Sequence, residues 1–348
     1  MGVLQIIGDR PGAGKTCLAA ALLIRGREQG KKVGYYKPFS HSPDGNSDVD
    51  FVSRQVLGGA NGADAPRPYP AAEAGAGVSL AGGLPQGIGQ GIEAAVDWLA
   101  AANDLVVVEG PDLYTRQGEA SPLTGQPATL GNSRVVLLFR YTKGLDAASI
   151  ATAAEPLRQR LAGVIINGVT VYRRREVSQG LLESLRARNL PVWGALPEDR
   201  AMLSVTVQQI ADYLGGTWAQ EPVNTDACID RLLIGANIMD AGPNYFGRFE
   251  HQAVITRGGR PDIQMASLAQ DTRCLVLTGG VEPIDYVKAE ARQREVPMIL
   301  VQQDTLTTAE ALAGLLRQSK IDCRRKVERF AELVRQNPDL AALDLALR

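Results

Sequence analysis

The chain has 348 residues, a formal net charge of −1 at pH 7 and 22% charged residues. That length predicts two domains, each large enough for a hydrophobic core of its own. The near-zero charge argues against nucleic acid or an anionic membrane surface as a partner. No apolar run approaches the ~20 residues of a membrane span, and the start lacks the basic segment of a signal peptide. We therefore expect a cytoplasmic protein with no membrane partner.

The cysteines are four in number and widely scattered: Cys17, Cys228, Cys274 and Cys323. No two of them have the C-x-x-C spacing of a redox or zinc motif. We expect reduced, mostly structural thiols, as is usual in a reducing compartment.

The most informative stretch runs from Gly8 to Thr16, between an apolar run at residues 3–7 and a helix-forming run at residues 18–24. This order of strand, glycine-rich loop and helix is the context of a phosphate loop. Backbone N–H groups and the helix N-terminus would face phosphate oxygens, Lys15 would reach the terminal phosphates, and the Thr16 hydroxyl would face Mg²⁺. The predicted nucleotide-binding residues of this loop are Gly12, Ala13, Gly14, Lys15, Thr16 and Cys17.

The loop departs from the common G-x4-G-K-[ST] spacing, because Asp9 stands where the first glycine belongs. An ordinary glycine-rich turn before a helix is the alternative interpretation. A dinucleotide fingerprint is disfavoured, since Cys17 occupies the place of its third glycine.

A second strand is predicted at residues 32–38, with Lys37 kept extended by Pro38. A turn at residues 45–51 then leads into a helix ending near Leu57. Asp48 or Asp50 could face the phosphates from this turn, or either could simply cap the helix. Residues 58–91 are rich in Gly, Ala and Pro, which predicts a long loop, typically a lid or a subunit contact.

A buried strand follows a helix at residues 92–102 and ends at Glu109. Its continuous apolar run is typical of a parallel sheet covered on both faces. Ligands of open α/β sheets lie beyond the carboxyl ends of the strands, so Glu109 is a candidate Mg²⁺ ligand or water-orienting group. A helix cap or a surface acid is the alternative.

The alternation of strand and helix continues to about residue 214 and predicts a doubly wound, mostly parallel α/β sheet. The further elements are strand 134–139, helix 145–161, strand 162–167, helix 174–189, strand 191–195 and helix 200–214. Asn167 ends one of these strands and could hydrogen-bond a base edge, although an Asn at a strand end is more often a plain turn residue.

A break at residues 215–222 indicates a domain boundary, giving a first domain of residues 1–218 and a smaller α/β domain of residues 219–348. The second domain should contain strands 231–236, 253–256, 274–278 and 298–301, and helices 263–269, 284–295 and 309–317. Its C-terminal segment has apolar residues at Val327, Phe330, Ala331 and Val334. That spacing predicts an amphipathic helix packed on its own domain or on a second subunit.

The first half resembles the dethiobiotin synthetase family, and the second half looks like a DRTGG-type domain. The first resemblance covers about residues 1–215 and rests on residues 8–16, 34–38, 46–48, 107–110 and Asn167; the second rests on residues 254–256, 260–262 and 277–280. The combination is similar to the N-terminal regulatory region of long bacterial phosphotransacetylases, without their catalytic domain.

The resemblance implies that Lys15 and Thr16 hold phosphate and metal, and that Asp48 and Glu109 complete a Mg²⁺ site. It implies that Asn167 meets the adenine of ATP. In dethiobiotin synthetase the lysine that matches Lys37 helps bind the carbamate substrate, which would make Lys15 and Lys37 the catalytic residues. The loop departs from that family at Asp9-Arg10-Pro11, and so does the Gly110-Pro111-Asp112 segment.

Three functions remain open. The preferred one is a nucleotide-binding regulatory or sensor protein, linked to acetyl-phosphate and acetyl-CoA metabolism, with a small-molecule ligand at the second domain. The second is an ATP-dependent ligase acting on a carboxylate or carbamate. The third is a MinD-like dimerising ATPase, in which Arg10 would reach a partner's phosphates across a dimer; a simple surface contact is an equal interpretation of Arg10. A homodimer is expected from the family resemblance.

Overall fold

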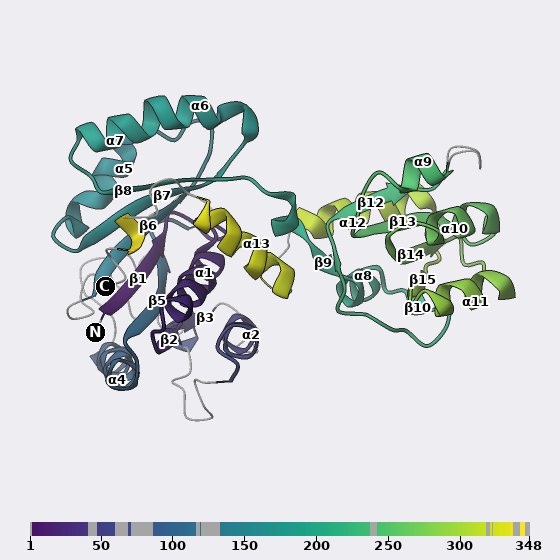
Figure 1. Cartoon of the computed structure of the whole chain (residues 1–348), viewed down its shortest axis with the longest axis horizontal. Coiled ribbons are helices and arrows are strands. Elements are labelled where there is room, and N and C mark those ends of the chain that lie inside the picture. The colour runs from purple at the N-terminus through teal and green to yellow at the C-terminus, as the bar shows by residue number, and fades with distance from the viewer. Residues whose placement is uncertain are drawn as a thin grey trace. The chain divides into compact units, whose positions relative to one another are not determined.

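The structure is a computed structural model that describes residues 2–40, 47–59, 69–70, 86–115, 119, 133–236, 242–317, 321, 323–336 and 342–344 (Figure 1). The chain forms two compact units. The first comprises Met1–Glu198 and Val327–Arg348, and the second comprises Asp199–Lys326. Among the described residues, no helix is long and apolar enough to cross a membrane.

The first unit is built on a six-stranded sheet in the order β2-β5-β1-β6-β7-β8, and every neighbouring pair is parallel. These strands are β1 (Gly2–Gly8), β2 (Val33–Tyr36), β5 (Leu105–Asp112), β6 (Arg134–Arg140), β7 (Leu161–Val169) and β8 (Val192–Pro197). A small parallel pair, β3 (Phe39–Ser40) with β4 (Tyr69–Pro70), stands beside it. The predicted doubly wound parallel sheet is confirmed.

Helices cover both faces of this sheet, and Figure 1 shows α1 and α5 on opposite sides of it. The helices are α1 (Lys15–Glu28), α2 (Ser47–Gln55), α4 (Gln86–Ala102), α5 (Ala147–Ala154), α6 (Arg174–Glu176) and α7 (Glu183–Ala187), with 3-10 turns at Glu155–Leu157 and Val171–Arg173 and a π-helical turn at Val177–Leu182. On one face of β5, the alternate side chains of Val106 and Val108 pack against the apolar face of α4. The predicted loop at residues 58–91 lies mostly outside the described residues.

The C-terminal helix α13 (Arg324–Arg335) begins in the second unit and continues in the first. The predicted apolar positions from Val327 to Val334 are buried. Arg335 pairs with Glu28 of α1 at 3.1 Å, and the guanidinium of Arg25 binds Asp344. The sequence placed this helix in the second domain. In the structure its last turns belong to the first unit, since the α1 side chains supply its charged partners.

The second unit carries a five-stranded sheet in the order β10-β15-β14-β13-β12. Its strands are β10 (Thr217–Trp218), β12 (Arg231–Ile234), β13 (Gln252–Arg257), β14 (Thr272–Thr278) and β15 (Met298–Leu300), and a separate pair joins β9 (Val205–Thr206) to β11 (Cys228–Ile229). Only β10 runs antiparallel to its neighbour within the five-stranded sheet. The helices are α8 (Val207–Leu214), α9 (Gly242–Phe246), α10 (Pro261–Leu268), α11 (Asp285–Gln293) and α12 (Thr305–Arg317).

The helix predicted at residues 200–214 is wrong in its first half. A 3-10 turn (Arg200–Leu203) and the short strand β9 come first, and α8 then starts behind a capping box. The Thr206 hydroxyl accepts from the backbone N–H of Gln209, and the Gln209 side chain accepts from the backbone N–H of Thr206. This Thr-x-x-Gln pattern is a helix-start signal that the sequence contained. The helix core joins the second unit, so the first unit ends at Glu198, upstream of the predicted boundary near residue 218.

A disulfide joins Cys228 of β11 to Cys323, 95 residues further along the chain. The expectation of four reduced thiols is therefore wrong for these two, because the fold brings together cysteines whose spacing carries no signal. Cys17 and Cys274 remain thiols, and Cys274 is buried in the core of the second unit. Both ends of the bridge lie in the second unit.

Candidate functional site

The phosphate loop leaves β1 at Gly8 and enters α1 at Lys15. Gly12 has a φ of 82° and Gly14 a φ of 104°, left-handed values that side chains disfavour. Gly14 is the N-cap of α1 and makes no side-chain cap bond. The first N–H groups of α1 therefore open toward the loop, as an anion site at a helix N-terminus requires.

Asn167 of β7 supports the backbone of this loop through a hydrogen bond. Its Nδ2 donates to the carbonyl oxygen of Ala13 at 2.7 Å, and both residues are buried. A Cβ on Gly14 would lie 2.6 Å from the same Nδ2, so only glycine fits there. Asn167, predicted to meet an adenine, thus binds the loop backbone through its amide nitrogen.

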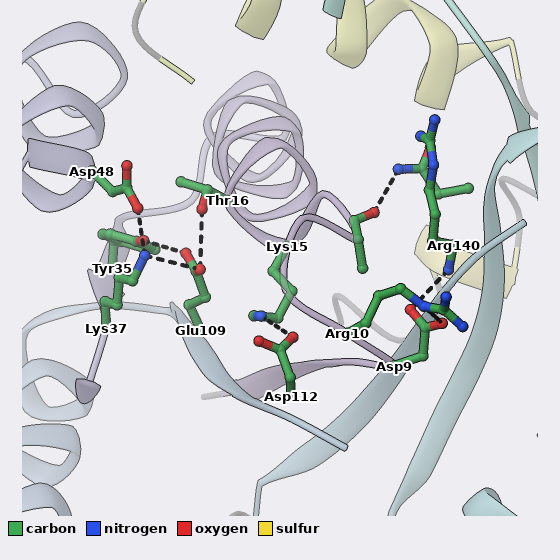
Figure 2. A network of polar contacts seen from close by, with 12 residues as sticks. Asp9, Arg10, Lys15, Thr16, Tyr35, Lys37, Asp48, Glu109, Asp112 and Arg140 are labelled. Carbon is green, nitrogen blue, oxygen red and sulfur yellow. Dashed lines mark hydrogen bonds and ion pairs between the residues drawn. The ribbon is translucent and has the colours of Figure 1, made fainter. Parts of the chain in front are cut away.

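Glu109 of β5 is the hub of the polar network in Figure 2. Its side chain is 4% exposed, and its Oε1 accepts from the Thr16 hydroxyl at 3.0 Å while its Oε2 accepts from the Tyr35 hydroxyl at 2.7 Å. The Lys37 ammonium lies 3.2 Å from Oε1. Residues from α1, β2 and β5 thus converge on one buried carboxylate.

Lys37 bridges two carboxylates, because its Nζ also lies 2.5 Å from Asp48 Oδ2 at the start of α2. Asp50, the alternative candidate, is exposed. Of the two aspartates that the sequence left open, the structure brings Asp48 to the site.

The network shifts the pKa of its members in directions that favour charge pairing. Burial alone would raise the pKa of Glu109, but the ammonium groups of Lys37 and Lys15 and the hydroxyls of Tyr35 and Thr16 bring it below its ordinary value. Burial would lower the pKa of Lys37, yet Glu109 and Asp48 raise it well above its usual range. Burial and then the charge of Glu109 raise the pKa of Tyr35, which keeps its hydroxyl a donor. The site is a charged cluster at neutral pH.

Lys15 reaches across the loop to Asp112, the last residue of β5, and its ammonium pairs with Oδ1 of that carboxylate. Both side chains are 11% exposed. Gly8 makes room for the pair, since a Cβ there would lie 2.7 Å from Asp112 Oδ1 and 3.2 Å from the Lys15 side chain. Asp112 is a residue of this site that sequence reasoning did not select, although it noted the unusual Gly110-Pro111-Asp112 segment.

Asp9, the departure from the common loop pattern, is buried and ties the loop to β6. Its Oδ1 accepts from the backbone N–H of Arg140 at 2.9 Å, and its Oδ2 accepts from Arg10 Nε at 2.7 Å. The Arg10 side chain remains 46% exposed. A carboxylate in place of the first glycine therefore anchors the loop to the neighbouring strand.

A cavity of about 290 Å³ opens at the carboxyl ends of β6, β7 and β8. It is lined by Arg140, Tyr141, Thr142, Lys143, Gly168, Thr170, Arg173 and Glu198. Two of these flank residues already placed at the loop: Arg140 binds Asp9, and Gly168 follows Asn167. The cavity thus adjoins the phosphate loop on the side away from Glu109.

The donor set around Glu109 fits Mg²⁺. The Thr16 hydroxyl and the carboxylates of Asp48 and Glu109 are oxygen ligands, and Mg²⁺ usually takes one or two carboxylates together with substrate phosphates. The Lys37 ammonium now lies between the two carboxylates, so Mg²⁺ bound by them would share their negative charge with it. Within the described part of the chain, no cluster of three His, Cys, Asp or Glu side chains offers a metal site without phosphates.

Together the parallel sheet, the loop and its lysine define a P-loop nucleotide-binding domain. A family model described as an AAA domain matches residues 3–205, and a model described as a DRTGG domain matches residues 209–315. The chain belongs to this AAA-domain family, since the first match covers more than half of it.

The curated relatives include the phosphate acetyltransferase of Pseudomonas aeruginosa, to which the chain is 23% identical over 354 residues. The match covers 93% of this chain and 49% of that protein, so the chain spans about half the length of this relative.

Solved structures with partial likeness match one unit or the other. Cobyrinic acid a,c-diamide synthase from Mycobacterium smegmatis, with bound ADP and magnesium, is 19% identical, with 57% of this chain and 88% of that chain covered and a TM-score of 0.38. MinD from Aquifex aeolicus is 14% identical, and the match covers 58% of this chain and 84% of that chain with a TM-score of 0.38. The CBS and DRTGG domains of a Clostridium perfringens pyrophosphatase, complexed with diadenosine tetraphosphate, are 15% identical over 35% and 50%, with a TM-score of 0.28.

Proposed function

We propose that the first unit binds Mg-ATP and that the chain acts as a nucleotide-dependent regulatory or sensor protein. The observation that carries the proposal is the convergence of Thr16, Lys37 and Glu109 beside a phosphate loop that contains Lys15. An ordinary glycine-rich turn before a helix would not by itself bring a hydroxyl, an ammonium group and a carboxylate together beside the loop, where phosphate and Mg²⁺ would bind.

Each residue has a part in this proposal. The loop N–H groups and Lys15 would hold the phosphates, and Thr16, Asp48 and Glu109 would hold Mg²⁺, which neutralises phosphate charge when bound. The base would enter the cavity beyond Asn167, which is lined by Tyr141 and Arg140, side chains able to stack on a purine. The hydrogen bond from Asn167 to the loop would preserve the conformation of the loop while one nucleotide replaces another.

The regulatory part of the proposal rests on the second unit and on the matched relative. The DRTGG domain would take a small-molecule ligand, and the match to half of a phosphate acetyltransferase suggests a place in acetyl-phosphate and acetyl-CoA metabolism. We further propose a homodimer in the cytoplasm. The Cys228–Cys323 bridge would then form only under oxidising conditions, since cytosolic disulfides are rare.

An ATP-dependent ligase is the second candidate, and Lys37 favours it. Its ammonium is largely buried at the site, where it could bind a carboxylate or carbamate as the corresponding lysine does in the dethiobiotin synthetases that the chain resembles. Against it, Lys37 already contacts two carboxylates of the chain. A MinD-like ATPase rests on Arg10, whose side chain is partly exposed beside the loop.

The deciding experiment is calorimetric titration of the protein with Mg-ATP, followed by phosphate release with and without 7,8-diaminononanoate plus bicarbonate. Binding with little turnover in either condition would support the regulatory protein. Phosphate release that depends on the amine and bicarbonate would make the chain a ligase. Absence of nucleotide binding would overturn the proposal as a whole.

A further inference from the structure

The backbone of Asp112 is fixed by the β5 ladder and by the hydrogen bonds of the two residues that follow it. It closes β5, where it lies opposite Gly8 in the parallel ladder with β1. The two residues that follow donate their N–H groups to this loop region: Leu113 to Gly8 O at 2.8 Å and Tyr114 to Asp9 O at 2.9 Å. The Asp112 carboxylate is therefore anchored beside the start of the phosphate loop.

Lys15 has the longer side chain of the ion pair, and it is the member that can change its reach. Its ammonium stands at the end of a four-carbon chain, whereas Asp112 has one methylene between a fixed backbone and its carboxylate. When the lysine of a phosphate loop binds nucleotide, it reaches the β- and γ-phosphates. Asp112 then remains next to that ammonium, and its negative charge lies beside the terminal phosphate.

Two electrostatic costs follow for a nucleotide. Lys15 must share or leave a partner whose side chain is, like its own, 11% exposed, and a largely buried charge that loses its partner is destabilising. The approaching phosphate also meets the like charge of Asp112, and this repulsion is greater for a triphosphate than for a diphosphate. Glu109 is not in this position, because it lies among Thr16, Tyr35 and Lys37.

We propose that Asp112 is a specificity-determining residue of the nucleotide site, an internal counter-ion of Lys15 that lowers affinity for phosphates and disfavours the triphosphate relative to the diphosphate. This inference rests on the proposed nucleotide binding and adds to it the selection between ATP and ADP. In this proposal Asp112 weakens nucleotide binding, whereas Thr16, Asp48 and Glu109 strengthen it.

The test replaces the carboxylate by an amide of the same shape, Asp112→Asn, and measures affinity calorimetrically for Mg-ATP, Mg-ADP and inorganic pyrophosphate. We expect the Kd of Mg-ATP to fall by about tenfold and that of Mg-ADP by about threefold, because the amide removes the repulsion. The nucleotide-free variant should unfold at a lower temperature than the wild type, since Lys15 loses its ion pair. Opposite changes in stability and affinity are the signature of a competing counter-ion.

The matched control is Asp97→Asn, the same chemical change on the exposed face of α4, which should leave both quantities unchanged. Unchanged or weaker ATP binding in Asp112→Asn would overturn the inference while leaving nucleotide binding in place. If the variant does not fold, the wild type still tests it: Mg-ADP should bind at least as tightly as Mg-ATP, and a clear preference for ATP would overturn it. No binding of any nucleotide to the wild type would overturn the proposed function and this inference with it.

Discussion

Asn167 donates from Nδ2 to the carbonyl oxygen of Ala13 at 2.7 Å, which joins the end of β7 to the middle of the phosphate loop. Asn167→Leu keeps a similar volume and removes the donor without adding a charge beside the loop. We expect it to weaken both Mg-ATP and pyrophosphate binding by about tenfold, because the loop loses its support and a buried carbonyl loses its partner.

Titration with the two ligands distinguishes loop support from base recognition. If Asn167 acted on the adenine alone, pyrophosphate affinity would not change, and the loop-support interpretation would be refuted. Asn103→Leu is a suitable control, because Asn103 is an amide donor to Leu99 O at the end of α4 and takes no part in the polar network of the site.

Lys15→Ala should abolish measurable binding of Mg-ATP, raising Kd by about 100-fold or more, since its ammonium is the group that reaches the terminal phosphates. The thermal shift produced by saturating nucleotide should disappear with it. Lys32→Ala removes an equal charge from an exposed position and should bind as the wild type does. Retained affinity in Lys15→Ala would mean that the glycine-rich turn is not a phosphate loop.

Glu109 should make the free energy of unfolding depend on pH in the acid range. Its pKa in the folded state is below its ordinary value, so its stabilising effect is complete above the unfolded-state pKa of about 4.3 and disappears as pH falls through the folded-state pKa. We expect Glu109→Gln to lower the free energy of unfolding by about 3 kcal/mol at neutral pH. Its difference from the wild type should shrink at acid pH.

Denaturant titrations at a series of pH values, from neutral down to the acid transition, measure this difference. Glu93→Gln, the same substitution on the exposed face of α4, should differ little from the wild type throughout. A Glu109→Gln deficit that grows as the pH falls would contradict the expected pairing with Lys37 and Lys15.

The disulfide between Cys228 and Cys323 predicts two accessible thiols in the unfolded, unreduced protein and four after reduction. Mass spectrometry after alkylation in denaturant counts them. Because the bridge closes a long loop, reduction should lower the free energy of unfolding of the second unit by about 2–4 kcal/mol.

A Cys228→Ala, Cys323→Ala double variant provides the control for the bridge. Its melting temperature should not respond to reductant, whereas that of the wild type should fall. Four alkylated thiols in protein purified under oxidising conditions would show that the bridge does not form in solution.

The arrangement of elements was largely predictable because the longer strands and helices have local signals. The apolar runs of β1 and β5 and the Gly-Lys-Thr at the start of α1 lie within a few residues of where the structure has them. The strand at Val205–Thr206 was missed because two residues show no periodicity. The strand that pairs with it, β11, comes after α8 in the sequence, so the pairing depends on tertiary structure.

The site was predictable only where a side chain belongs to a known pattern. Lys15, Thr16 and Glu109 stand at positions where phosphate loops and strand ends place their ligands. Asp112 lies 97 residues from Lys15, and their contact depends on β5 being the neighbour of β1, which no local pattern encodes. Tyr35 was missed for the same reason, since it reaches Glu109 only because β2 pairs with β5.

The path of the chain has a consequence for dissecting this protein into fragments. The second unit is an insertion in the covalent order of the first, which ends at Glu198 and resumes at Val327. A fragment that stops at residue 218 would therefore lack the segment whose Asp344 pairs with Arg25, and with it the buried apolar side chains of α13 from Val327 to Val334. Faithful isolation of the nucleotide domain calls for excising the middle of the chain and splicing its two outer pieces with a short linker.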